Sequence, residues 1–481
     1  MTLELEKNIQ GDVKKNNQTN IQIQRCGQRF LPSGRYQISK KAWAVRLVIL
    51  FFIAYIGVNN LMQGLELGDS LVIYSTIMPI HALLVLCIGW FFYKNPAKGK
   101  VGNELVSVII PVYNQKSMVR FVIEAIYQST YQNLEVIAVN DGSKDGTKEI
   151  LDELAKKYPS LKVIHKKNEG KRKAVAAGFY SSTGRYIALI DSDSIVDNRA
   201  ITEIMKTFNA NPQIGAIVGN AKIWNIEKSF LAKCQDAWYD FAFNVHKTTE
   251  SVFGNVLCCS GCLAGYRRET IENFIPYWSN SNFHLSDDRE LTTYAIASPW
   301  ARKELSSLSQ IAMMSASKYD DSEDRLLTAQ SLVNWKAVYV PSAIVYTDAP
   351  EKLKGFFKQQ IRWKRGTVRT NFFVTSFFWK KNPIMSFLFY VEFMTTFTLP
   401  VIILTVLIYE PLILKNFWLP MFFAVGHVLT GVIRALDYKF RDRKTKTWLH
   451  HFPMVMMEAF VLPWLAIPAL WGLKRNEWLT R

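Results

Sequence analysis

Cysteine is scarce in this sequence, with 6 cysteines among 481 residues. Three of them, Cys258, Cys259 and Cys262, lie in one short stretch, and the spacing of the last two fits half of a zinc site. No second Cys or His pair follows in the sequence at the spacing of a zinc finger. We therefore expect reduced thiols with a structural role, as is usual in the cytosol.

The glycine-rich phosphate-binding motifs are missing as well. Neither G-x-G-x-x-G nor the P-loop pattern occurs in the sequence, which argues against a dinucleotide-binding fold and against a P-loop nucleotidase.

Basic residues outnumber acidic ones, since the sequence has 58 Lys and Arg but 40 Asp and Glu, and the net charge is +18. Such an excess can bind nucleic acid, but here the cations flank long apolar runs, so we expect no nucleic-acid partner.

These apolar runs predict an integral membrane protein. The four runs long enough to cross a hydrocarbon layer of ~30 Å are Ala42–Gln63, Leu71–Tyr93, Ile384–Tyr409 and Asn416–Leu436. The first run starts too late and is too long to be a cleaved signal peptide. A fifth segment, Phe452–Leu473, is interrupted by prolines, so we expect it to enter the membrane and return, or to lie along its surface.

The distribution of charge predicts how the chain is oriented. The loop between the first two runs carries only Glu66 and Asp69, whereas Lys and Arg cluster before residue 47, after residue 93 and after residue 437. The positive-inside rule then places the N-terminus and the residues after Tyr93 in the cytoplasm. We expect a multi-pass protein of the plasma membrane that contacts membrane lipid and has a cytoplasmic catalytic domain.

The composition changes along the chain and divides it into six predicted parts. Residues 351–382 mix aromatic and basic side chains, which is typical of amphipathic helices at a membrane surface. The parts are a polar cytoplasmic tail (1–40), two transmembrane helices (41–93), an α/β domain (103–350), interface helices (351–382), two transmembrane helices (383–437), and a basic loop with the proline-broken segment and the C-terminal end (438–481).

Strand-length apolar runs alternate with helical patterns from residue 106 to residue 165. This alternation predicts an α/β doubly wound nucleotide-binding domain, in which ligands bind beyond the carboxyl ends of the strands. Val112 and Tyr113 come at the end of the first predicted strand, and Asp141 follows the second. We expect these residues to lie close together at one edge of the sheet.

Two carboxylates, Asp191 and Asp193, follow the buried run Ile187–Ile190. Hard oxygen ligands with open positions suit Mg²⁺ or Mn²⁺ bridging a diphosphate. Nearby, Lys171 and Arg172 open a predicted helix, and a helix N-terminus with cations is an anion site. Together these residues predict a nucleotide-diphosphate site.

Five motifs lie between Val106 and Trp363, namely Pro111–Asn114, Asp141–Ser143, Asp191–Asp193, Ser322–Arg325 and Gln359-x-x-Arg362-Trp363. In this order they resemble the processive family 2 glycosyltransferases of membranes, which include cellulose, chitin and hyaluronan synthases. A finer resemblance, to hyaluronan synthases, rests on residues 242–245, 253–254, 259–261 and 266–268, on Gly170–Arg172 and on Trp478–Arg481. Cys262 departs from it, since that subfamily usually has proline there.

The resemblance implies a GT-A fold and inversion of the anomeric centre without a covalent intermediate. UDP-sugars and the growing polysaccharide would be its partners, Mg²⁺ or Mn²⁺ its cofactor, and no obligate protein partner is expected. Asp191 and Asp193 would hold the metal beside the nucleotide. The nucleoside would contact Val112, Tyr113 and Asp141, and the nucleotide diphosphate would contact Lys171, Arg172, Arg362, Trp478 and Arg481. The acceptor sugar would contact Cys259, Ser260, Gly261 and Trp363. Gln359 would be part of the catalytic motif.

The motif that carries the catalytic base occurs twice, as Ser286–Thr292 and as Ser322–Thr328. The first copy follows residues 266–268 at about the expected distance, and the second precedes the tryptophan motif by the expected spacing. We favour Asp324, with Glu323 beside it, because that second spacing sets the base against the acceptor. Asp288 is the alternative.

Other classes of protein fit the sequence less well. A transporter would show internal repeats and more intramembrane charges than Glu392. A non-processive lipid-linked sugar transferase would lack Gln359-x-x-Arg362-Trp363. Among polysaccharide synthases we expect a hyaluronan synthase that uses UDP-N-acetylglucosamine and UDP-glucuronate and extrudes its product. A chitin-like or other synthase that uses a single UDP-sugar stays open.

Overall fold

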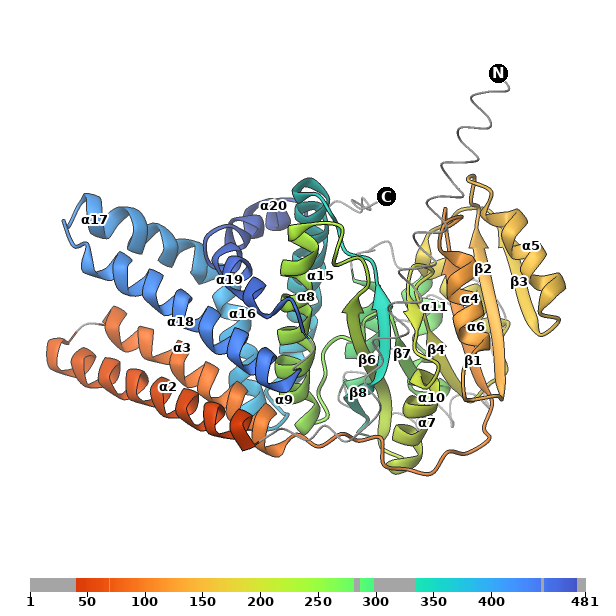
Figure 1. The fold of residues 1–481 in the computed structure, drawn as a ribbon, viewed down its shortest axis with the longest axis horizontal. Helices are drawn as coiled ribbons and strands as arrows, with labels where there is room; N and C mark the ends of the chain where they lie inside the picture. Colours follow the sequence, from red (N-terminus) through yellow and green to blue (C-terminus); the bar gives the residue numbers. More distant parts are fainter. Residues whose placement is uncertain (1–39, 69, 281–285, 298–333, 443–444, 474–481) are drawn as a thin grey trace, which may run out of the picture.

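The computed structural model describes residues 40–68, 70–280, 286–297, 334–442 and 445–473. In this part of the chain a mixed sheet of eight strands stands at one end and long apolar helices extend from the other (Figure 1). The strand order is β3-β2-β1-β4-β7-β6-β8-β5. The strands are β1 (Val106–Val112), β2 (Leu134–Asp141), β3 (Leu161–Lys166), β4 (Tyr186–Leu189), β5 (Ile195–Val196), β6 (Ile214–Ile223), β7 (Ala264–Arg267) and β8 (Lys336–Thr347).

The predicted alternation of strands and helices is confirmed in the first half of the sheet. β1 pairs in parallel with β2 on one side and with β4 on the other, and β3 extends the parallel run. Val108, Ile109 and Ile110 of β1 are fully buried, as expected for a parallel strand covered on both faces. The helices of this half are α4 (Val119–Tyr127), α5 (Thr147–Lys157) and α6 (Lys171–Tyr180), whereas α7 (Ala200–Ala210) packs against β6 and β8.

The middle of the sheet departs from the parallel pattern. β7 runs antiparallel to both of its neighbours, β4 and β6, while β6 and β8 pair in parallel. β7 has only four residues and follows a stretch rich in Cys, Ser and Gly. Its sequence is therefore too short to show the hydrophobic alternation that would predict a strand. Three short helices follow it, α10 (Arg268–Ile271), α11 (Ile275–Asn280) and α12 (Asp287–Ile296).

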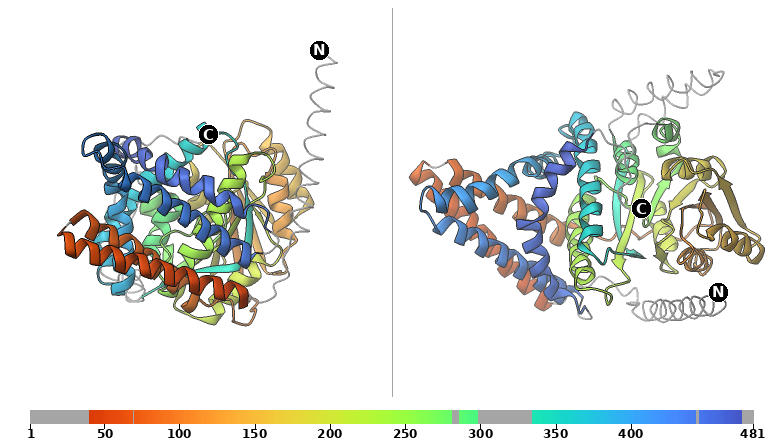
Figure 2. Two further views of the ribbon diagram at one scale, coloured as in Figure 1. Left: turned by 60° about the vertical axis from the view of Figure 1, so that its left-hand side comes forward. Right: turned by 90° about the horizontal axis from the view of Figure 1, so that it is seen from above.

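A layer of helices separates the sheet from the apolar end, and α8 and α15 stand in this layer in all the views (Figures 1 and 2). α8 (Phe230–Phe241) continues through the π-helical turn η2 (Ala242–His246) into α9 (Lys247–Val252). α15 (Leu353–Phe378) covers the residues predicted to form interface helices. Its Phe356, Phe377 and Phe378 are fully buried, so the helix packs inside the protein as well as carrying basic side chains.

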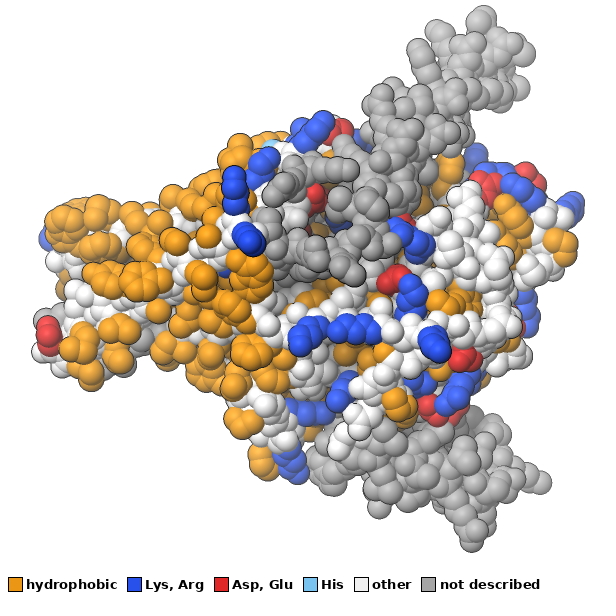
Figure 3. Space-filling model, turned by 60° about the horizontal axis from the view of Figure 1, so that its bottom comes forward, with side chains coloured by type: hydrophobic (Ala, Val, Ile, Leu, Met, Phe, Trp, Pro, Cys, Tyr) orange, Lys and Arg blue, Asp and Glu red, His pale blue; other side chains and the backbone are white. Residues whose placement is uncertain are grey.

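Three of the described helical stretches are long and apolar enough to cross a membrane, namely Lys40–Glu66, Pro383–Leu412 and Trp418–Arg441. Their exposed side chains are largely hydrophobic, and Figure 3 shows these side chains gathered over the helical end of the molecule. The helices are α2 (Lys40–Leu67), α3 (Ser70–Cys87) with η1 (Ile88–Phe92), α16 (Pro383–Leu404) with η3 (Thr405–Tyr409), α17 (Glu410–Leu412) and α18 (Trp418–Arg441).

Two predicted apolar segments look different from these three. Over the second predicted span, the described apolar helix is the shorter stretch Ile77–Phe92. The proline-broken segment forms two helical stretches, Trp448–Phe460 and Leu462–Trp471, which meet at an angle of 50°. The bend falls at the start of the second stretch, where Pro463 is the second residue. The elements of the segment are η4 (Trp448–His450), α19 (His451–Phe460), η5 (Leu462–Leu465) and α20 (Ala466–Trp471).

Candidate active site

The parallel strands bring the predicted nucleotide-binding residues to one edge of the sheet. Val112 at the end of β1 pairs with Asn140, the residue before Asp141, and Leu189 at the end of β4 pairs with Ile109 of β1. Asp141 therefore emerges next to the end of β1, and Asp191 emerges two residues beyond β4. The predicted cluster at the carboxyl ends of the strands is present.

Asp141 holds the loop that leads into α6. Its carboxylate is buried and accepts hydrogen bonds from the backbone N–H groups of Glu169 (3.0 Å) and Gly170 (2.8 Å) and from Lys166 Nζ (3.0 Å). Gly170 has φ of +97°, a conformation that side chains disfavour, and α6 begins at the next residue. Asp141 thus fixes the start of α6, and its contact with the nucleoside stays a prediction.

Lys171, the first residue of α6, lies between two carboxylates. Its Nζ is 2.7 Å from Asp191 Oδ1 and 3.6 Å from Asp288 Oδ1. Burial lowers the pKa of Lys171, but the neighbouring carboxylates of Asp191, Asp288 and Asp287 raise it by more, so the pKa lies above its usual value and the side chain stays an ammonium. Asp288 belongs to the first copy of the duplicated motif.

The backbone of Gly261 joins the same group. Its carbonyl accepts a hydrogen bond from the N–H of Asp191 (2.8 Å), and its own N–H donates to Asp288 Oδ2 (2.8 Å). A Cβ at this position would lie 2.9 Å from Asp288 Oδ1, 2.9 Å from Lys171 Nζ and 3.0 Å from Asp191 Oδ1. The absence of a side chain at residue 261 is therefore what lets the three charged groups meet.

Asp288 is set in place by α12 and by the segment in front of β7. Its backbone carbonyl accepts a hydrogen bond from Thr292 Oγ1 (2.7 Å), and Thr292 in turn accepts one from the N–H of Cys259 (2.8 Å). Burial raises the pKa of Asp288, and the ammonium of Lys171 offsets part of this increase. A raised pKa suits a carboxylate that must take up a proton near neutral pH.

Arg172 lies away from the predicted diphosphate site. Its guanidinium is buried, with Nε 2.5 Å from Asp287 Oδ1 and Nη1 2.8 Å from Glu290 Oε2, and it stacks over Trp278. Successive helical residues point about 100° apart, so Lys171 faces the site while Arg172 faces the core. Arg172 therefore does not lie where the expected contact with the nucleotide would place it. It joins α6 to α12 through its ion pairs with Asp287 and Glu290.

Four aromatic side chains, Trp238, Tyr239, Phe243 and Trp363, contact one another in a row, and we call them the aromatic wall. The ring centroid of Trp363 on α15 lies 5.9 Å from that of Trp238 and 6.5 Å from that of Tyr239, and Tyr239 lies 5.9 Å from Phe243. Burial, followed by the charges of Cys262 and Asp193, raises the pKa of Tyr239. Through Tyr239 the aromatic wall is thus close to Asp191 and Asp193, which we call the acidic pair. This closeness is expected if an acceptor sugar stacks on the wall.

Two other predicted site residues carry buried oxygen atoms. Within the described residues, neither Ser260 Oγ nor Gln359 Oε1 has a hydrogen-bond partner. Buried polar atoms are nearly always paired in proteins, so these two unpaired oxygens are candidates for contact with a polar ligand. A sugar, which is rich in hydroxyl groups, would satisfy both atoms.

The acidic pair also fits the predicted metal. In the part of the chain that the structure describes, no three His, Cys, Asp or Glu side chains form a metal-binding group. Mg²⁺ in nucleotide enzymes, however, is commonly held by one or two carboxylates, with phosphate and water oxygens completing the shell. Asp191 and Asp193, both half-buried at the end of β4, supply a donor set of this kind.

Some predicted residues lie outside the described part of the chain, namely Glu323, Asp324, Trp478 and Arg481. Asp288, the alternative base, lies at the site, and Tyr239 joins it although its sequence position was not predicted to matter. A signal for Asp288 was present, since the first motif copy follows residues 266–268 at the expected distance. Tyr239 lies one helical turn before Phe243 in a stretch that resembles an acceptor site, and this spacing could have indicated it.

With this geometry the comparisons define the class of protein. Residues 107–274 match the family described as Glycosyl transferase family 2, and the chain is a glycosyltransferase with a GT-A fold. More particularly, it is similar to hyaluronan synthase from Streptococcus pyogenes, with 27% identity over 452 residues, which cover 90% of this chain and 97% of the relative.

Two further similarities bear on the fold and the product. The chain is 24% identical over 310 residues to poly-β-1,6-N-acetyl-D-glucosamine synthase from Staphylococcus epidermidis, covering 63% of this chain and 66% of that protein. The solved mannosyltransferase from Pyrobaculum calidifontis, in complex with GDP-Man and Mn²⁺, shares the fold with a TM-score of 0.53 and 16% identity, covering 84% of this chain and 98% of that structure.

We predict that Gly261→Ala lowers turnover by ~100-fold, because moving catalytic groups by about an ångström has effects of that size. The methyl group would push Lys171, Asp191 and Asp288 apart. Turnover of a UDP-sugar and the thermal unfolding temperature would both be measured on the purified protein. Gly426→Ala on α18 is the matched control, since a Cβ there meets no atom within 4 Å and activity should be kept. Full activity of Gly261→Ala would contradict the importance of this contact.

Proposed function

We propose that the protein is a processive, inverting glycosyltransferase that polymerises UDP-N-acetylglucosamine and UDP-glucuronate into hyaluronan and extrudes the polymer across the membrane. The catalytic part of this proposal rests on one observation, namely that Lys171, Asp191 and Asp288 contact one another beside Gly261. The similarity to hyaluronan synthase over nearly the full length of both chains favours the product.

In this proposal Asp288 is the base, in place of Asp324. It lies next to the acidic pair, it is held by the N–H of Gly261, and its pKa is raised by burial. Asp288 takes the proton of an acceptor hydroxyl, whose oxygen forms the new bond to C1 of the sugar. The bond between C1 and the diphosphate oxygen breaks at the same time, and UDP leaves with its electron pair.

The leaving diphosphate is stabilised from the start of α6. Lys171 supplies an ammonium, and the backbone N–H groups at the N-terminus of α6 would face a bound diphosphate. A divalent metal held by Asp191 and Asp193 would neutralise further charge on the diphosphate; Mn²⁺ accompanies the nucleotide sugar in the mannosyltransferase of similar fold. Trp363 and its aromatic neighbours would hold the acceptor sugar by stacking.

We predict that Asp288→Asn lowers polymer synthesis by ~10²–10⁴-fold while leaving UDP affinity nearly unchanged, because a base acts in the transition state and not in nucleotide binding. Initial rates of UDP release and UDP titrations on the purified protein would measure both effects. Asp324→Asn is the matched comparison, since it removes the corresponding carboxylate from the second copy of the motif. A dead Asp324→Asn together with an active Asp288→Asn would return the role of base to Asp324.

A polymer made from a single UDP-sugar is the second candidate product. The similarity to poly-β-1,6-N-acetyl-D-glucosamine synthase favours it, although that match covers only 63% of this chain. Both candidates share the site geometry, because each reaction needs a base, a diphosphate site and an acceptor surface. They differ in the donor sugars that the enzyme requires.

We predict that purified protein in nanodiscs makes polymer only when UDP-glucuronate, UDP-N-acetylglucosamine and Mg²⁺ or Mn²⁺ are all supplied. Release of UDP and digestion of the product with a hyaluronan-specific lyase would be measured, with EDTA and each single UDP-sugar as controls. Polymer from UDP-N-acetylglucosamine alone that resists the lyase would establish the second candidate instead.

We further propose that the catalytic domain faces the cytoplasm and that the bent segment Trp448–Trp471 does not cross the membrane as a fifth span. The 50° bend supports this, as do Lys474 and Arg475 directly after the segment. Gly472 also lies against α15, the helix that carries Trp363, since a Cβ on it would come within 2.7 Å of three guanidinium atoms of Arg365. The chain thus returns to the side of the active site.

We predict that a cysteine at position 479, in a background without other cysteines, is labelled by a membrane-impermeant thiol reagent only in inverted vesicles. Residues after the returning segment would be cytoplasmic, and UDP should protect the cysteine if Trp478 and Arg481 bind the nucleotide. A cysteine placed at position 68, in the loop between α2 and α3, serves as the control and should be labelled from the outside. Labelling of position 479 in intact cells would contradict the proposed topology.

A further inference from the structure

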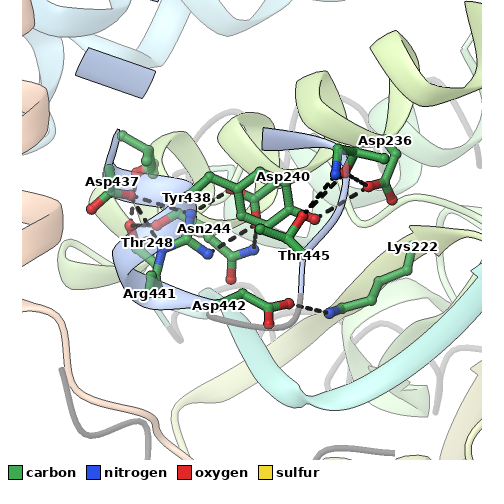
Figure 4. Close-up of polar contacts among 12 residues, drawn as sticks. Lys222, Asp236, Asp240, Asn244, Thr248, Asp437, Tyr438, Arg441, Asp442 and Thr445 are labelled. Carbon is green, nitrogen blue, oxygen red and sulfur yellow. Dashed lines mark hydrogen bonds and ion pairs between the residues drawn. The ribbon is translucent and has the colours of Figure 1, made fainter. Parts of the chain in front are cut away.

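The helix run α8–η2 presents two different faces. Asp236, Asp240 and Asn244 recur at intervals of four residues and form a polar stripe toward α18 and the loop after it (Figure 4). Tyr239 and Phe243, one residue before Asp240 and Asn244, belong to the aromatic wall, and Tyr239 lies close enough to Asp193 and Asp191 to feel their charges. Any rotation or shift of α8 that alters one face therefore alters the other.

A line of buried ion pairs joins the polar stripe to the membrane helices. Arg441 on α18 forms a two-pronged ion pair with Asp240, in which Nη1 lies 2.9 Å from Oδ1 and Nη2 contacts Oδ2 (Figure 4). Arg441 Nε also donates to Asp437 Oδ2 (3.2 Å), and Asp437 Oδ1 lies 2.9 Å from Nη2 of Arg46 on α2. All four side chains are at most 7% exposed.

The same line continues into the sheet. Asn244 donates from Nδ2 to Asp240 Oδ1 (3.0 Å) and accepts at Oδ1 from the hydroxyl of Tyr339 (2.9 Å), which lies in β8. Polar contacts therefore run without interruption from α2, through α18 and α8, to the sheet. These contacts connect the helices that span the membrane with the helix that carries half of the aromatic wall.

The groups that perform the chemistry are on other elements. Lys171 begins α6, Asp191 follows β4, and Asp288 lies on α12. Trp238 and Tyr239 contribute to holding a sugar chain but are not part of that charged group. A change in the polar stripe should therefore disturb how the polymer is held between additions more than each addition itself.

We propose that the Asp240–Arg441 pair is a positioning latch that fixes the aromatic wall relative to the membrane helices and thereby keeps the growing polymer bound between additions. Asp240 and Arg441 act through Tyr239 and Trp238 and do not touch the reacting atoms. The role in retention rests on the proposed polymerase function, whereas the mechanical role of the latch does not.

The latch is tested with Arg441→Gln, Asp240→Asn and the double variant in full-length protein in nanodiscs. Arg441→Gln leaves Asp240 as a buried carboxylate without its guanidinium, whereas the double variant removes both charges and leaves the Arg46–Asp437 pair intact. We expect Arg441→Gln to shorten the polymer by about tenfold with UDP release changed by less than about threefold, and the double variant to regain most of the length, because directly paired groups are strongly coupled.

Two controls separate the latch from general damage. Arg120→Gln removes a short ion pair with Glu153 (2.6 Å) on the surface of the catalytic domain and should leave polymer length unchanged. Hydrogen exchange of the α8 amides, followed by mass spectrometry, should rise in Arg441→Gln and fall back in the double variant. This second readout does not need any polymer, so it tests the latch even if the wild-type protein makes a different product.

The outcomes are distinct. Wild-type protein that releases UDP but makes no polymer would refute the proposed function, and the exchange data would then decide on the latch alone. Unchanged length and exchange in Arg441→Gln would overturn the latch. So would a double variant no better than the single one, or a loss of UDP release in proportion to the loss of length, since each indicates ordinary destabilisation.

Discussion

The candidate active site depends on one ammonium group, that of Lys171, which holds two carboxylates close together. Without Lys171, the carboxylates of Asp191 and Asp288 would repel each other, and the charge that draws the start of α12 toward the end of β4 would be lost. Every other feature of the site serves this contact. Asp141 fixes the loop before Lys171, Gly261 makes room for the three groups, and Arg172 ties α12 to α6 through the core.

Neighbouring cations in this protein have very different tasks, and local sequence does not reveal them. Lys171 and Arg172 look alike as a basic pair at a helix start, yet one faces the site and the other is enclosed by Asp287, Glu290 and Trp278. Tertiary packing determines which face of α6 contacts α12, since α12 is more than a hundred residues further along the chain. The direct partners of a buried arginine are therefore found only in the structure.

Much of the fold could be predicted because it rests on local periodicity. The strands of the parallel half, the helices between them and the acidic pair at the end of β4 all follow from apolar runs and turn residues near them in sequence. β7 could not be predicted, because four residues carry too little pattern and its two antiparallel partners are distant. Spacing alone does not decide between Asp288 and Asp324, because the two copies of the motif are nearly equal and differ in what lies near them in space. The structure describes only the surroundings of Asp288.

The place of β7 also bears on how this protein folds. The chain leaves the sheet after β6, passes along the long apolar helices as α8, η2 and α9, and returns as β7 between β4 and β6. Tyr186 pairs with Arg267, so this central ladder closes a loop of 81 residues (267 − 186 = 81). Contacts so distant in sequence form slowly. The intervening residues include α8 and η2, whose polar stripe pairs with side chains of α18. A fragment containing residues 103–350 alone would lack Arg441, so Asp240 would lose its ion-pair partner and the face of α8 that packs on α18 would be uncovered.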